Sequence, residues 1–325
     1  MPKVTVLMPV FNGEKYLHEA INSILNQTFD NFEFLIFNDG STDNSADIIR
    51  SYTDKRIKFY DNLQNQGYVY HLNHGIEIAT GKYIARMDAD DISLPTRLKD
   101  QVDFMDRNPK VGACGTWFKF IDSSYIVKHP KDDSQIRLAL LDNCAIGHPT
   151  VMLRTDLLRR FNLRYDSSFM PAEDYLMWIK LAQHCRLANL PKVLLEYRIH
   201  SNQISSARKS DQEKKAQLVR NCQIEMLLNR SLTETEIYYH SILFHPSPNI
   251  DIQLISNLQS WINTIIFYNK KLKLYSELEL LYLLEKRLGS VIKQLIKSKI
   301  YNINFLNKFW KVRNIWVEFK KLLSR

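Results

Sequence analysis

The chain has 325 residues, of which 45% are apolar and 24% are charged, proportions typical of a folded protein and not of a disordered one. No run approaches 18 apolar residues, so no membrane-spanning helix is expected. The first apolar stretch, residues 4–11, lacks the basic leader and the cleavage site of a signal peptide. The four cysteines are far apart and form no CxxC pair, which favours reduced thiols in a cytoplasmic protein.

The net charge of +9 is concentrated near the C-terminus. From residue 286 onward there are eleven basic residues and one acidic residue, Glu318, whereas the preceding part of the chain is close to neutral. A near-neutral body does not resemble a nucleic-acid-binding groove. We therefore expect no nucleic-acid partner, and the basic tail is a separate feature.

The first part of the chain alternates β-rich runs with helical patterns. Short apolar runs predict strands, and apolar residues three and four positions apart predict helices. The predicted strands cover residues 4–10, 32–37, 57–60 and 82–87, and the predicted helices cover residues 16–27, 43–52 (capped by Ser41 or Thr42) and 68–79. This alternation predicts an α/β fold of Rossmann-like character, with a mostly parallel central sheet and helices on both faces.

The pattern becomes less regular further along the chain. Pro95 is placed to open another helix in its first turn, and residues 111–121 are typical of a long strand. Beyond about Ser206 glycine almost disappears, and helical patterns continue to the end. We therefore predict two domains, an α/β domain over residues 1–205 and an all-helical domain over residues 206–325.

Polar clusters follow three of the predicted strands, namely Asn12-Gly13, Asn38-Asp39-Gly40 and residues 88–91. The carboxyl ends of parallel strands share one edge of the sheet, where ligands bind. Three aspartates within four residues repel one another unless water or a cation screens them. The residues alone leave both possibilities open for this acidic turn. They also leave open whether Asp39 is a turn residue or a ligand-binding group.

Several motifs, taken in their order, resemble the family 2 glycosyltransferases, which are inverting enzymes with the GT-A fold. The motifs are residues 4–11, 38–43, 65–67, 72–75, 81–83, 87–91, 173–178 and 197–200. The resemblance covers roughly residues 3–205, which implies that the α/β domain is the catalytic domain. It is specific for the family and uninformative about the sugar.

The resemblance also implies how a nucleotide-sugar donor is bound. Asp39 accepts the N3–H of uracil, where cytosine has an acceptor, which favours a UDP-sugar. Of Asp88 and Asp90, one is implied to face the ribose and the other to bind Mn²⁺ or Mg²⁺ on the diphosphate, while the role of Asp91 stays open. His200 matches a position that contacts the metal or the diphosphate. The other residues implied to bind the nucleotide are Pro9, Phe11, Asn12, Gly67, Asn73 and Arg86.

Glu173 and Asp174 begin a predicted helix, where acidic residues are also favourable for electrostatic reasons alone. Given the resemblance, Asp174 is the candidate general base for the acceptor hydroxyl, and Glu173 assists it. His148 is implied to lie near the acceptor or the donor sugar, and Trp178 is expected in the core with one edge toward the acceptor. His71 departs from the family, which usually has a small residue there.

The end of the chain has apolar residues at alternating spacings of four and three, from Phe305 to Leu323, with lysines largely off this stripe. Such a helix either packs on its neighbours with a solvated basic face or lies on an anionic membrane surface. The second interpretation predicts a peripheral protein at the inner face of the cell membrane. The helical region is also a candidate for oligomer formation.

Together these features predict an inverting, metal-dependent glycosyltransferase that transfers a sugar to a hydroxyl of a glycan or a lipid-linked glycan. One alternative is a sugar nucleotidyltransferase, although the first strand is not followed by the glycine-rich basic loop of those enzymes. Another is a non-catalytic scaffold protein with the GT-A fold, against which the intact Asp39, Asp90 and Asp174 argue.

Overall fold

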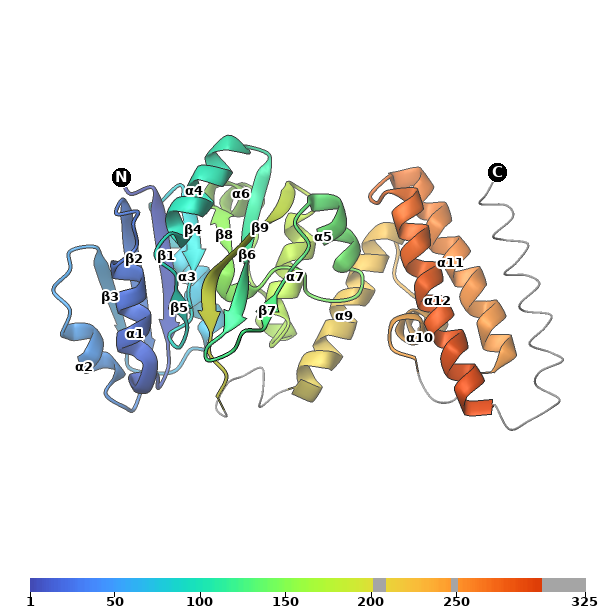
Figure 1. Cartoon of the computed structure of the whole chain (residues 1–325), viewed down its shortest axis with the longest axis horizontal. Helices are drawn as coiled ribbons and strands as arrows, with labels where there is room; N and C mark the ends of the chain where they lie inside the picture. Colours follow the sequence, from blue (N-terminus) through green and yellow to red (C-terminus); the bar gives the residue numbers. More distant parts are fainter. Residues whose placement is uncertain (201–208, 247–250, 300–325) are drawn as a thin grey trace. The chain divides into compact units, whose positions relative to one another are not determined.

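The computed structural model describes residues 1–200, 209–246 and 251–299 (Figure 1). Contacts between residues divide the chain into two compact units, residues 1–220 and residues 221–325. The domain boundary predicted near Ser206 and the amphipathic stripe predicted from Phe305 onward both lie outside the described residues.

A nine-stranded sheet forms the centre of the first unit, with strand order β3-β2-β1-β4-β8-β6-β9-β5 and β7 paired to β6; the strands are labelled in Figure 1. The strands are β1 (Val4–Val10), β2 (Phe32–Asp39), β3 (Ile57–Asn62), β4 (Tyr83–Arg86), β5 (Ile92–Ser93), β6 (Val111–Phe120), β7 (Ile126–Val127), β8 (Met152–Arg154) and β9 (Arg186–Tyr197). The first four strands are parallel, as the alternation predicts. Strand β8 then runs antiparallel between β4 and β6, so the second half of the sheet is mixed.

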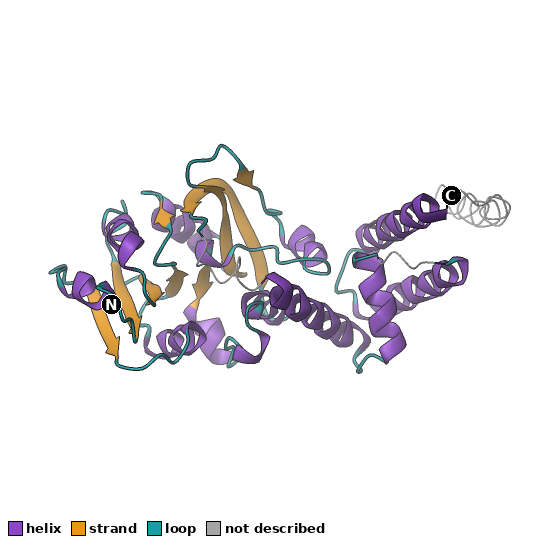
Figure 2. Cartoon of the chain, turned by 90° about the horizontal axis from the view of Figure 1, so that it is seen from below, coloured by secondary structure: helices purple, strands orange, loops and turns teal. Residues whose placement is uncertain are grey.

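Helices cover both faces of this sheet, which confirms the predicted layers (Figure 2). They are α1 (Glu14–Leu25), α2 (Ser45–Arg50), α3 (Tyr68–Ile78), α4 (Arg97–Arg107), α5 (Asp133–Ala139), α6 (Thr155–Arg160) and α7 (Glu173–Leu181). Side chains alternate along a strand, so β1 serves two cores. Val6 and Met8 pack with Leu17 of α1, whereas Leu7 packs with Leu72 of α3.

Two helices begin later than their sequence predicts. Helix α2 starts at Ser45 with Asn44 at its N-cap, because the Asp43 side chain instead accepts hydrogen bonds from the backbone N–H groups of Glu14 and Ser45. Helix α4 starts at Arg97, so Pro95 lies before the helix and not in its first turn.

The second unit is helical wherever the structure describes it, as predicted. Helix α9 (Lys209–Leu228) enters it, followed by α10 (Glu234–Phe244), α11 (Ile252–Leu272) and α12 (Glu277–Lys299). Thr233 and Glu236 form a reciprocal capping box at the start of α10, and Asp251 caps α11. Among the described helices, none has the length and hydropathy needed to cross a membrane.

Candidate active site

The turns that follow β1 and β2 are tied together by side-chain hydrogen bonds. The Asn12 side-chain oxygen accepts the backbone N–H of Thr42 at 2.8 Å, and the Asn12 N–H donates to the Ser41 hydroxyl at 3.0 Å. Asn12 has a left-handed backbone with φ of 48°, a conformation that asparagine tolerates better than most residues. Next to it, Phe11 is half exposed, and Pro9 is partly buried within β1. These three predicted donor-binding residues therefore lie at the carboxyl end of β1.

Asp39 is the last residue of β2 and is almost fully buried. Its Oδ1 accepts the backbone N–H of Gln66 at 2.6 Å, and its Oδ2 accepts the N–H of Gly67 at 3.0 Å. Gly67 has φ of 86°, which favours glycine and lets this turn approach the carboxylate. The imidazole Nε2 of His71 lies 2.7 Å from Oδ1. Two backbone N–H groups and the His71 ring therefore fix the orientation of the Asp39 carboxylate.

The acidic turn after β4 brings three carboxylates together. Ligand oxygens of Asp88, Asp90 and Asp91 all lie within 4.8 Å of one another. Asp91 is fully buried: its Oδ1 accepts the N–H of Arg198 at 2.9 Å, while its Oδ2 has no hydrogen-bond partner among the described residues. Burial, together with the charges of Asp88 and Asp90, raises the pKa of Asp91 well above its usual range. The turn therefore carries negative charge that its own side chains do not compensate fully.

Two buried arginines lie behind this turn. Arg86 forms an ion pair with Asp88, and Arg97 donates a hydrogen bond to the backbone carbonyl of Arg86 at 2.7 Å. Burial raises the pKa of Asp88 to about 6, although the Arg86 charge opposes this shift. Burial lowers the pKa of Arg97 to about 9, and the Arg86 charge acts in the same direction. The arginines stabilise the turn from its inner side and leave its outer side acidic.

The end of β9 brings a third segment to the acidic turn. The Nε2 atom of His200 lies 2.8 Å from Oδ2 of Asp90. The Nε of Arg198 donates to the backbone carbonyl of Asp90 at 2.8 Å, and its guanidinium lies 4.2 Å from the centre of the Tyr16 ring. His200 therefore lies beside the acidic cluster, although it is 110 residues away in sequence.

The Glu173–Asp174 pair forms a second acidic group at the start of α7. The backbone N–H of Tyr175 donates to Asp174 Oδ1 at 2.7 Å, and the Cys144 thiol donates to Asp174 Oδ2 at 3.6 Å. Glu173 is buried, and its Oε1 accepts the Tyr68 hydroxyl at 2.8 Å. Burial, assisted by the Asp174 charge, raises the pKa of Glu173 to about 7.

His148 lies on the other side of this pair, with its Nδ1 atom 4.0 Å from Oε1 of Glu173. Burial and the Arg86 charge lower the pKa of His148 well below its usual range, so the imidazole is neutral near pH 7. The same Arg86 charge lowers the pKa values of Glu173 and Asp174 against the larger effect of burial. The Arg86 charge thus acts on the pKa values of both acidic groups.

Two residues predicted to face a ligand instead have internal partners. The Asn73 amide forms two hydrogen bonds of 2.9 Å with the backbone of Tyr165, so it holds a loop in place. Trp178 has no exposed surface, and its indole N–H donates to the carbonyl of Ile146 at 3.2 Å. We therefore assign Trp178 to the core, since a fully buried ring has no surface with which to contact an acceptor.

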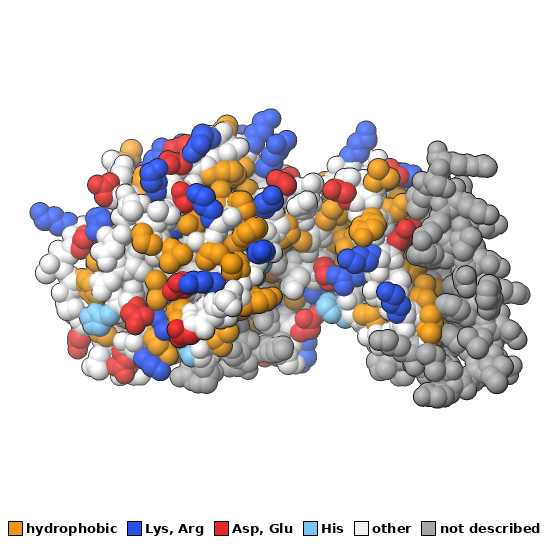
Figure 3. Space-filling model, viewed as in Figure 1, with side chains coloured by type: hydrophobic (Ala, Val, Ile, Leu, Met, Phe, Trp, Pro, Cys, Tyr) orange, Lys and Arg blue, Asp and Glu red, His pale blue; other side chains and the backbone are white. Residues whose placement is uncertain are grey.

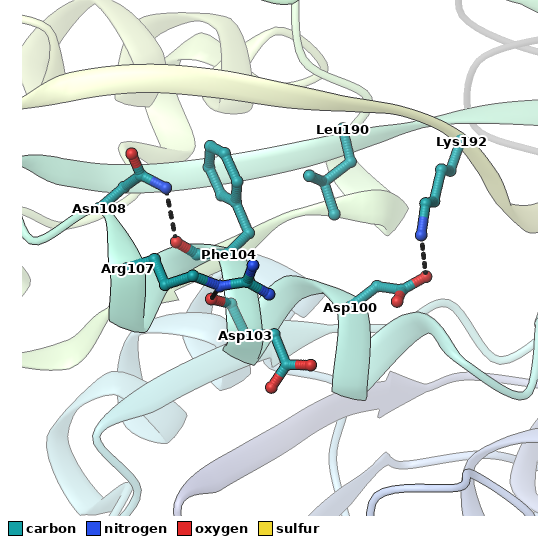
Figure 4. Close-up of a pocket in the computed structure, with 7 residues that line it drawn as sticks. All are labelled: Asp100, Asp103, Phe104, Arg107, Asn108, Leu190 and Lys192. Carbon is teal, nitrogen blue, oxygen red and sulfur yellow. Dashed lines mark hydrogen bonds and ion pairs between the residues drawn. The ribbon is translucent and has the colours of Figure 1, made fainter.

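A shallow surface pocket between α4 and β9 lies apart from these residues (Figure 4). It is lined by Phe104 and Leu190 and by charged side chains, including a Lys192–Asp100 ion pair of 3.1 Å. None of the predicted site residues lines it, so we do not connect it with the chemistry.

Sequence reasoning missed several residues that contact the site. Arg97 looked like an ordinary helix-start residue, and Tyr68 and Cys144 belong to no motif that we singled out. Their roles depend on long-range contacts, such as the one between Tyr68 and Glu173, which lie 105 residues apart. No local spacing signals such contacts.

Comparisons with known proteins agree with this geometry. Residues 5–165 match the family described as "Glycosyl transferase family 2". The chain is 33% identical over 292 residues to an uncharacterized glycosyltransferase of Haemophilus influenzae, covering 80% of this chain and 90% of that protein. It is 30% identical over 205 residues to an Escherichia coli UDP-Glc:alpha-D-GlcNAc-diphosphoundecaprenol beta-1,3-glucosyltransferase, covering 62% of this chain and 79% of the relative.

Two solved structures share the fold. The Staphylococcus aureus protein TarS (residues 1–349), in complex with UDP-GlcNAc, is 21% identical with a TM-score of 0.62, covering 92% of this chain and 91% of that one. The mannosyltransferase PcManGT of Pyrobaculum calidifontis, in complex with GDP-Man and Mn²⁺, is 16% identical with a TM-score of 0.55, covering 90% and 87%. Family match, relatives and fold agree: the chain belongs to glycosyl transferase family 2 and is a glycosyltransferase with the GT-A fold.

Proposed function

We propose that this glycosyltransferase inverts the anomeric centre as it moves a sugar from a UDP-sugar to a hydroxyl of a glycan or a lipid-linked glycan. The observation that carries the proposal is the presence of two acidic groups in one domain: the carboxylates of residues 88–91, which lie within 4.8 Å of one another beside His200, and the Glu173–Asp174 pair at the start of α7. The first group suits a metal-bound diphosphate and the second suits proton abstraction. One relative, named above, takes its sugar from UDP-Glc, and another is an O-antigen biosynthesis glycosyltransferase of Escherichia coli.

Donor recognition is assigned to the carboxyl ends of β1 and β2. A carboxylate such as Asp39 accepts a hydrogen bond and pairs with the N3–H of uracil, whereas cytosine offers only an acceptor there. Phe11, half exposed beside this turn, offers an apolar surface for the base. Pro9, Asn12 and Gly67 shape the same edge of the sheet.

The acidic turn fits a divalent cation. Its donors are hard carboxylate oxygens, three of them within 4.8 Å of one another, and the buried Oδ2 of Asp91 has no partner among the described residues. We propose that Asp90, assisted by Asp88 and His200, would hold Mn²⁺ or Mg²⁺. Such a cation stabilises negative charge on a departing nucleoside diphosphate.

Asp174 is the proposed general base. It accepts the proton of the acceptor hydroxyl while that oxygen attacks the anomeric carbon. The pKa of Glu173 is raised to about 7, so this carboxyl group keeps its proton up to a higher pH than an ordinary one. Its hydrogen bond to Tyr68 positions the pair. His148, which lies 4.0 Å from Glu173, is proposed to contact the sugar or the acceptor as a neutral imidazole.

Contact with the inner face of the membrane is proposed through the helical unit. Its surface mixes apolar, basic and acidic side chains (Figure 3). The turn from α11 to α12 exposes Lys270, Lys271 and Lys273. The large apolar side chains exposed from α11 through the start of α12 are Phe267, Leu272, Leu274, Leu278 and Tyr282. Such a mixture suits the headgroup region of an anionic bilayer.

The activity is tested by nucleoside diphosphate release from a panel of UDP-, GDP- and CDP-sugars. We expect release from a UDP-sugar that is abolished by EDTA, restored by Mn²⁺ or Mg²⁺ and lost in Asp90→Ala. Asp103→Ala serves as the matched control, because the Asp103 side chain is 41% exposed and its ion-pair partner among the described residues is Lys99 of the same helix. Turnover that is indifferent to EDTA and to both Asp90→Ala and Asp174→Asn would contradict the mechanism.

Membrane contact has its own test, which is co-sedimentation of the full chain with anionic liposomes. We expect less binding by the double variant Leu278→Glu/Tyr282→Glu and by a chain that ends at residue 299. Equal binding by all three proteins would rule out this contact.

A further inference from the structure

We propose that His71 is a positioning residue for the nucleobase: it occupies one oxygen of Asp39, so that the other oxygen alone is available to uracil. The inference rests on the proposed role of Asp39 and adds a residue to it. His71 lies on α3, 32 positions after Asp39, which ends β2.

The contact between the two side chains is short and fully enclosed. His71 Nε2 lies 2.7 Å from Asp39 Oδ1, and the exposed fractions of the two side chains are 0% and 3%. The imidazole also stacks on the Phe37 ring at 5.4 Å and meets the edge of Tyr70 at 5.2 Å. Because it is packed on both sides, the ring can change its orientation only if the core around it opens.

The partners of the two carboxylate oxygens are unequal. Oδ1 faces the backbone N–H of Gln66 and the His71 ring, which fill its two lone-pair positions. Oδ2 has one donor among the described residues, the N–H of Gly67 at 3.0 Å. The carboxylate therefore has room for one more hydrogen-bond donor, at Oδ2. The N3–H of uracil is such a donor.

The hydrogen-bond network also determines the tautomer of His71. A carboxylate oxygen accepts, so Nε2 carries the hydrogen. The other nitrogen, Nδ1, is buried with no hydrogen-bond partner among the described residues. An unpartnered buried polar atom destabilises the folded protein. A leucine would avoid that unpartnered atom but would also remove the hydrogen bond to Asp39, so the bond to the carboxylate is what accounts for a histidine here.

Losing the His71 donor would leave Oδ1 with one partner, the backbone N–H of Gln66. The terminal torsion of an aspartate is broad, so the carboxylate could then turn and present either oxygen. Uracil would lose a preorganised acceptor, whereas cytosine, which makes no such bond at N3, would lose nothing. His71 is therefore expected to affect affinity for uracil nucleotides and not affinity for nucleotides in general.

The test is calorimetric titration of the full chain with UDP and with CDP, both in the presence of Mg²⁺. We expect His71→Leu to weaken UDP binding about tenfold and to leave CDP binding unchanged. The ratio of UDP affinity to CDP affinity, called here the UDP-to-CDP ratio, should therefore fall. His71→Gln places a side-chain N–H near the Nε2 position and should restore most of the ratio. In donor turnover, His71→Leu should raise KM with kcat nearly unchanged.

The chain offers a matched control in His74, which lies on the same helix. Its ring contacts the same Phe37 ring at 5.4 Å and makes no bond to Asp39. His74→Leu should leave the UDP-to-CDP ratio at the wild-type value. If His71→Leu does not fold, His71→Met replaces it as the variant that lacks a donor.

The possible results distinguish a failure of the proposed role of Asp39 from a failure of the inference about His71. If Asp39→Asn binds UDP as well as the wild type, the proposed role of Asp39 fails. If Asp39→Asn loses UDP binding while His71→Leu behaves as His74→Leu does, the inference about His71 is overturned and the proposed function stands. An equal loss of UDP and CDP binding in His71→Leu, or a loss that His71→Gln does not restore, would reduce His71 to a packing role.

Discussion

The hydroxyl of Tyr68 donates a hydrogen bond of 2.8 Å to Oε1 of Glu173, and this bond joins the two ends of the site. Tyr68 directly follows Gly67, whose N–H holds Asp39, and Glu173 directly precedes the proposed base. Burial and the Glu173 charge raise the pKa of Tyr68 well above its usual range, so the hydroxyl stays a donor. A displacement of the turn that contains Gly67 would therefore also move the Glu173 carboxyl group, next to Asp174 in the chain.

Asp174→Asn should separate chemistry from binding. The amide keeps the shape of the side chain but cannot accept the acceptor's proton, so kcat should fall by about 10²–10⁴-fold while UDP affinity stays within twofold. Nucleoside diphosphate release with acceptor present and calorimetry with UDP measure the two quantities. The exposed Asp103→Asn is the control. A parallel loss of kcat and UDP affinity would show that Asp174 contributes to donor binding instead.

Glu173→Gln should stabilise the ligand-free protein at high pH. The folded-state pKa of Glu173, about 7, lies above the ordinary value of 4.5, so the native state binds more protons between these values and wild-type stability falls as pH rises through this window. Glutamine keeps an acceptor for Tyr68 and carries no charge. We expect a gain of about 1–3 kcal/mol at pH 8 that vanishes near pH 5. Urea unfolding at both pH values measures it, and an equal effect at both would contradict the shift.

Glu33→Gln should lower the stability of the folded protein at neutral pH, whereas Glu173→Gln should raise it at high pH. Glu33 is buried and accepts hydrogen bonds from Lys58, Thr5 and Thr80, which outweigh burial and lower its pKa to about 2. Its stabilising effect is complete above the ordinary value of 4.5 and disappears as pH falls towards 2. We expect the variant to be about 1–3 kcal/mol less stable at pH 7, with a smaller loss between pH 5 and pH 2. The exposed Glu77→Gln should keep the wild-type profile.

Gly81→Ala and Gly289→Ala form a pair with opposite expected effects. A Cβ at Gly81 would lie 2.5 Å from the backbone N of Thr5 and 2.7 Å from the carbonyl carbon of Val4, so the bend before β4 would have to move away from β1. We expect a loss of about 2–4 kcal/mol. Gly289 lies in α12 with nothing within 4 Å of its added Cβ, so alanine should stabilise by about 0.5–1 kcal/mol. Thermal unfolding of both variants checks the two signs.

Local patterns were enough to predict the first half of the sheet and its layers. The apolar runs and helical spacings of residues 4–87 depend on side chains that alternate along strands or recur along helices, and this periodicity is visible in a single sequence. The order of the motifs also predicted the family, which the comparisons confirm. The roles of Asp39, Asp90 and Asp174 within that family stay proposals.

Only the packed structure decided which residues share a site and which do not. Asn73 binds the backbone of Tyr165, Trp178 lies in the core, and β8 inserts antiparallel between β4 and β6. Arg97 lies behind the acidic turn, and His71 holds one oxygen of Asp39. These contacts join residues that are far apart along the chain or lie on different elements, and their burial, charge and hydrogen bonds exist only once the core has closed around them.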